Sequence, residues 1–275
     1  MEVPIQTIHL FPKLDEKLIE LLRSLTPEDW NKPTLAKQWT VKDIASHLLD
    51  GNIRVISQMR DHYVGDPPGK IESHQDLVDY LNRLNADWVK ATKRLSPGVL
   101  IELLEITRNA YHEQLSKLDP FAPAMFAVSW AGQTESPNWF HVAREFTEKW
   151  HHQQQIREAT GKPGIMTREF FYPVIDTFMQ ALPYTYRNLT APSGTCISIT
   201  ITSDCGGTWS IVRAENVWRL DSAKINPETK IKMHANTAWK LFTKGISSQQ
   251  AELEVTIEGN VSLGKPILTM LTVMA

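Results

Sequence analysis

Two features that organise many proteins are scarce in this sequence: cysteine and long apolar runs. Only two cysteines, Cys196 and Cys205, occur among 275 residues, too few for a disulfide framework or a thiolate zinc cluster. No apolar run approaches the roughly 20 residues that span a bilayer, and no basic segment followed by an apolar core opens the sequence. We therefore predict no membrane partner and a cytoplasmic location. Any thiol chemistry would use a thiol from outside the chain.

A large excess of charge of either sign is also missing. Lys and Arg number 29 against 31 Asp and Glu, which gives a net charge of −2. Such a chain has no broad basic field for phosphate backbones, so nucleic acid is not an expected partner. The hydrophobic content of 42% and the charged content of 22% are ordinary for globular proteins and predict a folded chain with room for two cores.

The spacing of apolar residues changes near Pro192. Before it, recurrence at three and four residues predicts helices at 14–25, 41–63, 74–95, 97–118, 138–160 and 167–187. After it, alternation predicts strands at 197–202, 209–212, 230–234 and 253–257, with helices at about 237–242 and 267–274. We therefore predict an α+β protein, with a helical bundle at residues 1–190 and a smaller α+β domain at residues 191–275. Residues 119–136 are predicted to form an irregular loop, either functional or a packed connection.

One helix carries a candidate metal-ligating histidine, His47. Thr40 and Asp43 have the spacing of a capping box, which marks where this helix begins. Counting 100° per residue places His47 beside the apolar stripe, with Gly51 one turn further on the same side. Because glycine destabilises a helix interior, we expect another group to approach Gly51 closely. His47 could also be a core-edge histidine bonded to a backbone carbonyl.

The helix predicted at 138–160 carries two further candidates, Glu148 and His152. They lie one turn apart, about 6 Å along the axis, so both side chains can converge on one ion. Phe146 and Trp150 form an apolar stripe on the opposite side, so the Glu148 and His152 face could instead be solvated. With His47 they would make a three-ligand site with open positions, the arrangement of catalytic metal sites.

Two stretches resemble a known family. The sequence W-T-V-K-D-I-A-S-H-L-L-D-G at residues 39–51 and the sequence R-E-F-T-E-K-W-H-H-Q-Q-Q-I-R-E-A-T-G at residues 144–161 resemble the DinB-like metalloenzyme superfamily. More narrowly they resemble the mycothiol-dependent maleylpyruvate isomerase family. Residues 238–245 and 255–260 resemble the smaller C-terminal domain of that family, which is related to sterol-carrier proteins.

The resemblance implies a DinB-like helical bundle that binds a divalent metal, usually zinc, through His47, Glu148 and His152. It also implies a low-molecular-weight thiol as cofactor. The sequence departs from the family at Gln155, where members commonly have aspartate, and at Lys244-Gly245, where they have a Gly-Arg pair. The guanidinium fork that binds a carboxylate through two hydrogen bonds is therefore missing at the second position.

The function predicted from these features is a divalent-metal-dependent enzyme. It would use a low-molecular-weight thiol for isomerisation or thiol transfer on a small electrophilic substrate. A thiol-independent metallohydrolase and a non-catalytic metal- or lipid-binding protein, including a metal-binding stress protein, remain alternatives. Gln155 and Arg144 are candidates for orienting the ligands, although Arg144 could equally form a helix salt bridge. Arg213, Arg219 and Lys244 could reach a substrate carboxylate or a thiol cofactor, or they could form surface salt bridges. No catalytic residue and no oligomeric state follow from the sequence.

Overall fold

The computed structural model describes residues 2–221 and 226–274, which form two compact units. Residues 7–119 and 148–165 build a helical unit, and residues 2–6, 120–147, 166–221 and 226–273 build a unit around a β-sheet. The division falls inside one long helix, whose first part belongs to the sheet unit and whose second part belongs to the helical unit. This division differs from the predicted domain boundary at residue 190, which stays a prediction.

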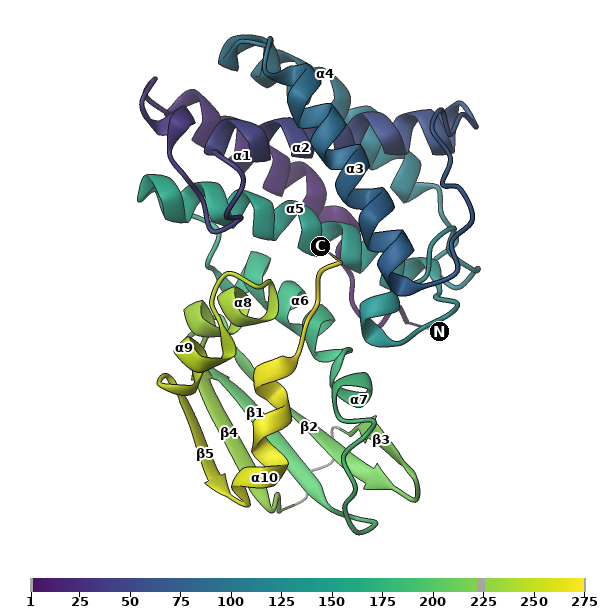
Figure 1. Ribbon diagram of the computed structural model, residues 1–275, viewed down its shortest axis with the longest axis vertical. Coiled ribbons are helices and arrows are strands. Elements are labelled where there is room, and N and C mark those ends of the chain that lie inside the picture. The colour runs from purple at the N-terminus through teal and green to yellow at the C-terminus, as the bar shows by residue number, and fades with distance from the viewer. Residues whose placement is uncertain (1, 222–225, 275) are drawn as a thin grey trace. The chain divides into compact units, whose positions relative to one another are not determined.

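The helical unit contains the predicted bundle helices except the one at 167–187, which lies in the sheet unit (Figure 1). They are α1 (Phe11–Arg23), α2 (Val41–Val55), α3 (His74–Thr92), α4 (Pro97–Ser116) and the C-terminal part of α5 (Asn138–Thr160), with the short turns η1 (Ile8–Leu10), η2 (Asp29–Asn31) and η3 (Ile56–Arg60). The helix predicted at 41–63 was too long, because the chain changes to a π-helical turn in η3. Within the described residues, no helix is long and apolar enough to cross a membrane.

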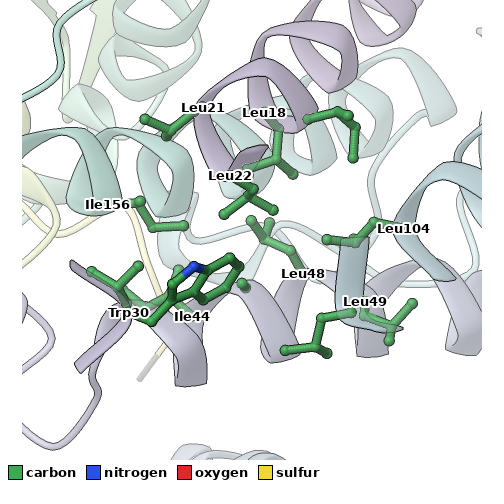
Figure 2. Close-up of a cluster of buried hydrophobic side chains, with 13 residues drawn as sticks. Leu18, Leu21, Leu22, Trp30, Ile44, Leu48, Leu49, Leu104 and Ile156 are labelled. Atoms are coloured by element: carbon green, nitrogen blue, oxygen red, sulfur yellow. The ribbon is translucent and has the colours of Figure 1, made fainter. Parts of the chain in front are cut away.

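One apolar cluster holds these helices together (Figure 2). It draws leucine, isoleucine and other apolar side chains from each of the four helices that surround it. Labelled members are Leu18, Leu21 and Leu22 of α1, Ile44, Leu48 and Leu49 of α2, Leu104 of α4 and Ile156 of α5. Burying such side chains contributes about 1.5–3 kcal/mol each. The predicted apolar stripe of α2 is therefore confirmed, and it fixes which face of α2 meets α5.

The start of α2 is set by the predicted capping box. The backbone N–H of Asp43 donates to the Thr40 hydroxyl, and the backbone N–H of Thr40 donates to the Asp43 carboxylate at 3.0 Å. The expectation for Gly51 was wrong, because a Cβ added there would meet no neighbouring atom within 4 Å. At its other end, α5 stops as predicted at Gly161, whose φ of +67° is a conformation that glycine adopts without strain.

The second unit is built on a five-stranded sheet of order β3-β2-β1-β4-β5 (Figure 1). The strands are β1 (Cys196–Thr202), β2 (Gly207–Ala214), β3 (Val217–Leu220), β4 (Thr229–His234) and β5 (Val255–Gly259). β1 pairs in parallel with β4, and the other neighbours are antiparallel. The isoleucines of β1 are buried, whereas Ser198 and Thr200 between them are partly exposed, so one face of the sheet carries the core.

Helices cover the buried face of this sheet. They are α6 (Arg168–Met179), α7 (Leu182–Thr185), α8 (Ala235–Phe242), α9 (Ser248–Glu252), α10 (Val261–Gly264) and the 3-10 turn η5 (Lys265–Thr269), while the 3-10 turn η4 (Ser129–Ala131) lies in the long loop. Asp176 of α6 accepts a hydrogen bond from Trp209 of β2 at 2.7 Å. The helix predicted at 167–187 is two helices, because the helical conformation is interrupted between Met179 and Leu182. The helix predicted at 267–274 was wrong, since only η5 forms there, and β3 was not predicted.

The open space beside Gly51 gives a stability test. Replacing Gly51 with alanine should raise the free energy of unfolding by up to about 1 kcal/mol, because alanine loses less backbone entropy and meets no clash. Urea unfolding of the metal-free protein measures the change. Gly264→Ala is the control, since its Cβ would lie 2.5 Å from Cγ2 of Ile257 and should destabilise. Destabilisation by Gly51→Ala would show that an unrecognised group occupies this space.

Candidate metal centre

The three predicted metal ligands all lie in the helical unit. His47 lies in α2, while Glu148 and His152 lie one turn apart in α5. The solvated-face alternative for α5 does not hold, because His152 is only 8% exposed. Trp150, on the opposite face, is fully buried, so α5 is enclosed on both sides.

His152 is oriented for coordination by a hydrogen bond to its other nitrogen. Its Nδ1 lies 3.0 Å from the Gln155 Oε1, an oxygen that can only accept, so Nδ1 donates and carries the proton. This assignment leaves the lone pair on Nε2, which lies 3.6 Å from the Glu148 Oε2. Burial, and to a smaller extent the neighbouring His151, holds the pKa of His152 well below its usual value. The ring is therefore neutral at pH 7, which is the form that binds metals.

His47 meets His152 edge-on. The two ring centroids are 4.7 Å apart at an interplanar angle of 76°. Nδ1 of His47 is enclosed and forms no hydrogen bond within the described residues, so the core-edge alternative with a carbonyl partner does not hold there. Burial first, and the nearby His152 second, keep its pKa well below the usual value. Trp39 covers both rings, at centroid distances of 4.8 Å from His47 and 6.1 Å from His152.

A third histidine, His151, joins the cluster and was not predicted. Its Nδ1 lies 3.8 Å from the Glu148 Oε2, and its ring centroid lies 3.9 Å from that of His152. Ligand atoms of Glu148, His151 and His152 all lie within 4.8 Å of one another, a group that does not include His47 among the described residues. His151 lies three residues after Glu148, and residues at this spacing are neighbours on a helix, so the sequence did offer a signal for it.

The residues present fit a divalent cation such as zinc. The donor set is one carboxylate and neutral imidazoles, the ligands that zinc takes. Nδ1 of His47 has no hydrogen-bond partner in the described residues, so the ring has a nitrogen available for a metal. The hydrogen bond to Gln155 fixes the tautomer of His152, so that its Nε2 can bind a metal. Glu148 keeps 29% side-chain exposure, so its side chain is partly in contact with solvent.

Beside this cluster, a buried lysine ties α5 to two other helices. Lys149 Nζ donates to Asp15 of α1 at 2.9 Å and to the amide oxygen of Asn52 of α2 at 2.8 Å. It also lies 4.3 Å from the centroid of the Tyr111 ring of α4. Asn52 lies on α2 with His47, and Lys149 lies next to Glu148 on α5. The hydrogen bond between Lys149 and Asn52 therefore holds the two helices together beside the cluster.

The other candidates from the sequence have different surroundings. Arg144 donates to Glu145 at 2.6 Å and lies 2.8 Å from Nδ1 of His141, so it forms a helix salt bridge, the second of its two predicted roles. Arg219 and Lys244 are exposed or partly exposed. Arg213 is buried and forms no salt bridge within the described residues.

Comparison with known proteins assigns the family. The family described as "Mycothiol maleylpyruvate isomerase N-terminal domain" matches residues 11–157, more than half of the chain. The chain belongs to this family. The match begins in α1 and ends in α5, so it contains His47, Glu148, His151 and His152.

Solved structures agree with the fold. A mutant of the mycothiol-dependent maleylpyruvate isomerase superposes with a TM-score of 0.56 at 10% identity, over 94% of this chain and 93% of the other. A second structure of that enzyme gives 0.53 at 11% identity, over 88% of each chain. No curated protein matches the sequence. The predicted membership of the mycothiol maleylpyruvate isomerase family and the predicted fold class, a DinB-like bundle with a C-terminal α+β domain, are confirmed.

In this member of the mycothiol maleylpyruvate isomerase family, the buried lysine should be essential for stability. Lys149→Met leaves Asp15, whose side chain is 6% exposed, as an unpaired buried charge, which should cost about 3–5 kcal/mol of unfolding free energy. The double variant Asp15→Leu with Lys149→Met should recover most of this loss. Chemical denaturation measures both.

The exposed Lys17–Glu20 pair is the matched control, and Lys17→Met should change stability by less than about 0.5 kcal/mol. An effect of Lys149→Met as small as that of Lys17→Met would show that the buried contact carries no net energy.

Proposed function

We propose that this protein is a divalent-metal-dependent enzyme that uses a low-molecular-weight thiol. It would carry out isomerisation or thiol transfer on a small electrophilic substrate. The observation that carries the proposal is the arrangement around His152: its Nδ1 is fixed by Gln155, its Nε2 faces Glu148, and its ring meets the unpartnered His47. Membership of the mycothiol maleylpyruvate isomerase family supports the thiol, and mycothiol is the first thiol to test.

The side chains would divide the work as follows. His47, Glu148 and His152 would hold a divalent ion, with the Glu148 carboxylate partly neutralising its charge. When bound at these ligands, such an ion supplies the Lewis acidity that keeps a thiol ionised at neutral pH. Gln155 would keep the lone pair of His152 on Nε2, and Trp39 would limit the access of water. In isomerisation the thiolate sulfur would add to one carbon of the double bond, and the π electron pair would move onto the electron-withdrawing group of the substrate. After rotation about the resulting single bond, this pair would return to re-form the double bond and expel the thiolate.

The thiol has to come from outside the chain. Cys196 and Cys205 are 1% and 6% exposed, and both belong to the sheet unit. Burial is the main cause that raises the pKa of the Cys196 thiol, which disfavours the reactive thiolate.

His151 supports a second candidate function. If His151 joined His47, Glu148 and His152, four protein ligands would fill a tetrahedral site, as in structural zinc sites. The protein would then bind metal without catalysis. The short distance between the His151 and His152 rings is the observation that favours this alternative.

Alanine substitutions of the histidines separate the two functions. His152→Ala and His47→Ala should each reduce bound metal to well below one ion per chain and abolish thiol-dependent turnover, because each removes one of three ligands. His151→Ala should keep both metal and turnover. Elemental analysis and a thiol-dependent isomerisation assay measure the outcomes.

His112, which contacts the Ile8 carbonyl at 3.2 Å in the same unit, is the control, and His112→Ala should leave metal content unchanged. Unchanged metal in His152→Ala would refute the proposed site. Loss of metal in His151→Ala would favour the closed, non-catalytic site, and turnover without added thiol would favour a metallohydrolase.

Gln155 gives a graded test of the same site. Gln155→Leu removes the acceptor of the His152 Nδ1 proton, so metal affinity should fall by about 10- to 100-fold while saturating zinc still restores one ion per chain. Gln155→Glu, which supplies a carboxylate acceptor, should retain affinity. Competition with a chromophoric chelator measures the constants, and equal affinity of Gln155→Leu and the unmodified protein would show that this hydrogen bond does not orient a ligand.

A further inference from the structure

Three residues form a row across one end of the sheet. Arg213 of β2 pairs with Trp218 of β3, and the backbone N–H of Arg213 donates to the carbonyl of Thr195 at 2.9 Å. Directly opposed residues project to the same face of a sheet, and Arg213 shares its face with Ile211, which is fully buried. Thr195, Arg213 and Trp218 therefore point to the side that the helices cover.

Within the described residues, the Arg213 guanidinium lies over the Trp218 ring but forms no ion pair. The residue is 9% exposed, and its Nε and Nη1 are enclosed without a hydrogen bond. In the part of the chain that the structure describes, no carboxylate forms an ion pair with it. Burying an unpaired guanidinium is strongly unfavourable, so a buried arginine is expected to have acceptors around it.

Arg157 in the helical unit is a buried arginine whose terminal nitrogens do have hydrogen-bond acceptors. Arg157 is 6% exposed, and its two terminal nitrogens donate to the backbone carbonyls of Lys17, Lys162 and Pro163 at 2.9–3.1 Å. Arg213 has no such carbonyls. The difference indicates that its acceptors come from a molecule outside the chain.

In the part of the chain that the structure describes, one more polar group without a partner lies on the residue opposite Arg213. The hydroxyl of Thr195, on a residue 1% exposed, is enclosed without a partner. The hydroxyl of Tyr186 is also enclosed and lies by the backbone of Ile267. The Tyr186 ring centroid lies 5.7 Å from that of Trp218, and Cζ of Arg213 lies 5.8 Å from the same Trp218 ring. The Tyr186 ring and the Arg213 guanidinium thus lie around one aromatic ring.

We propose that Arg213 and Thr195 bind the carboxylate of a small organic acid. A carboxylate matches the planar fork of a guanidinium with two parallel hydrogen bonds, and its remaining lone pairs can accept from the Thr195 hydroxyl. Of the guanidinium nitrogens, Nε and Nη1 are the ones that are enclosed without a partner in the described residues, and the proposal assigns the acid to them. The site lies wholly within the sheet unit and stands independently of the metal chemistry.

Binding of simple acids to the full chain tests this site. Succinate and acetate are titrated by calorimetry in a low-salt buffer, with inorganic phosphate as the comparison anion, and thermal midpoints are recorded in parallel. Succinate should bind and raise the midpoint of the unmodified protein. Arg213→Met should abolish binding, Thr195→Val should weaken it several-fold, and Arg213→Lys, which keeps the charge but loses the fork, should weaken it at least as much.

Arg219→Met is the matched control, because Arg219 lies on β3 next to Trp218 but is exposed. It should bind succinate like the unmodified protein. Without any acid, Arg213→Met should be at least as stable as the unmodified protein, since it removes an unpaired buried charge.

Four results would overturn the proposal. They are the absence of carboxylate binding, equal binding by Arg213→Met, binding of phosphate alone, and a lower midpoint or failure to fold for Arg213→Met in the absence of acid. The last result would mean that the fold itself already stabilises the guanidinium.

Discussion

The need to pair the polar groups that α5 buries is the constraint on which the helical unit depends. Between residues 149 and 157 this helix is buried on nearly every side, yet most of its side chains are polar. Each buried group must find a partner or destabilise the fold. Lys149 finds Asp15 and Asn52, Arg157 finds backbone carbonyls, and His152 finds Gln155. These contacts fix the rotation of α5 and bring Glu148 and His152 to the His47 side of α2.

The same constraint explains why the cluster suits a metal ion better than a proton. Burial makes the protonated forms of His47 and His152 unfavourable, so both rings stay neutral and each keeps one nitrogen with a free lone pair. A divalent cation supplies the positive charge that such nitrogens and the Glu148 carboxylate attract. Whether His151 also coordinates decides between an open and a closed site. That choice separates the proposed catalysis from metal binding without catalysis.

Local signals predicted much of this structure, and tertiary contacts decided the rest. The Thr40 capping box and the Gly161 helix end depend on a few neighbouring residues, so sequence was sufficient for both. The break between α6 and α7, the strand β3 and the 3-10 turn η5 depend on packing against the sheet, which periodicity does not describe. For the site, the spacing of Glu148 and His152 predicted their convergence. His151 lies three residues after Glu148 on the same helix, a local spacing that could have indicated it. The unpaired nitrogens of Arg213 depend on distant parts of the chain, so no sequence pattern indicated them.

The central claim is that two imidazoles and one carboxylate, drawn from α2 and α5, bind a single divalent cation with room for a thiol. X-ray absorption spectroscopy of the zinc-loaded protein tests it most directly. The account predicts light-atom ligands alone at about 2.0–2.1 Å, and one added sulfur at about 2.3 Å when the thiol is supplied. A spectrum with four protein ligands that does not change on addition of any thiol, or a protein that takes up no zinc, would contradict the account.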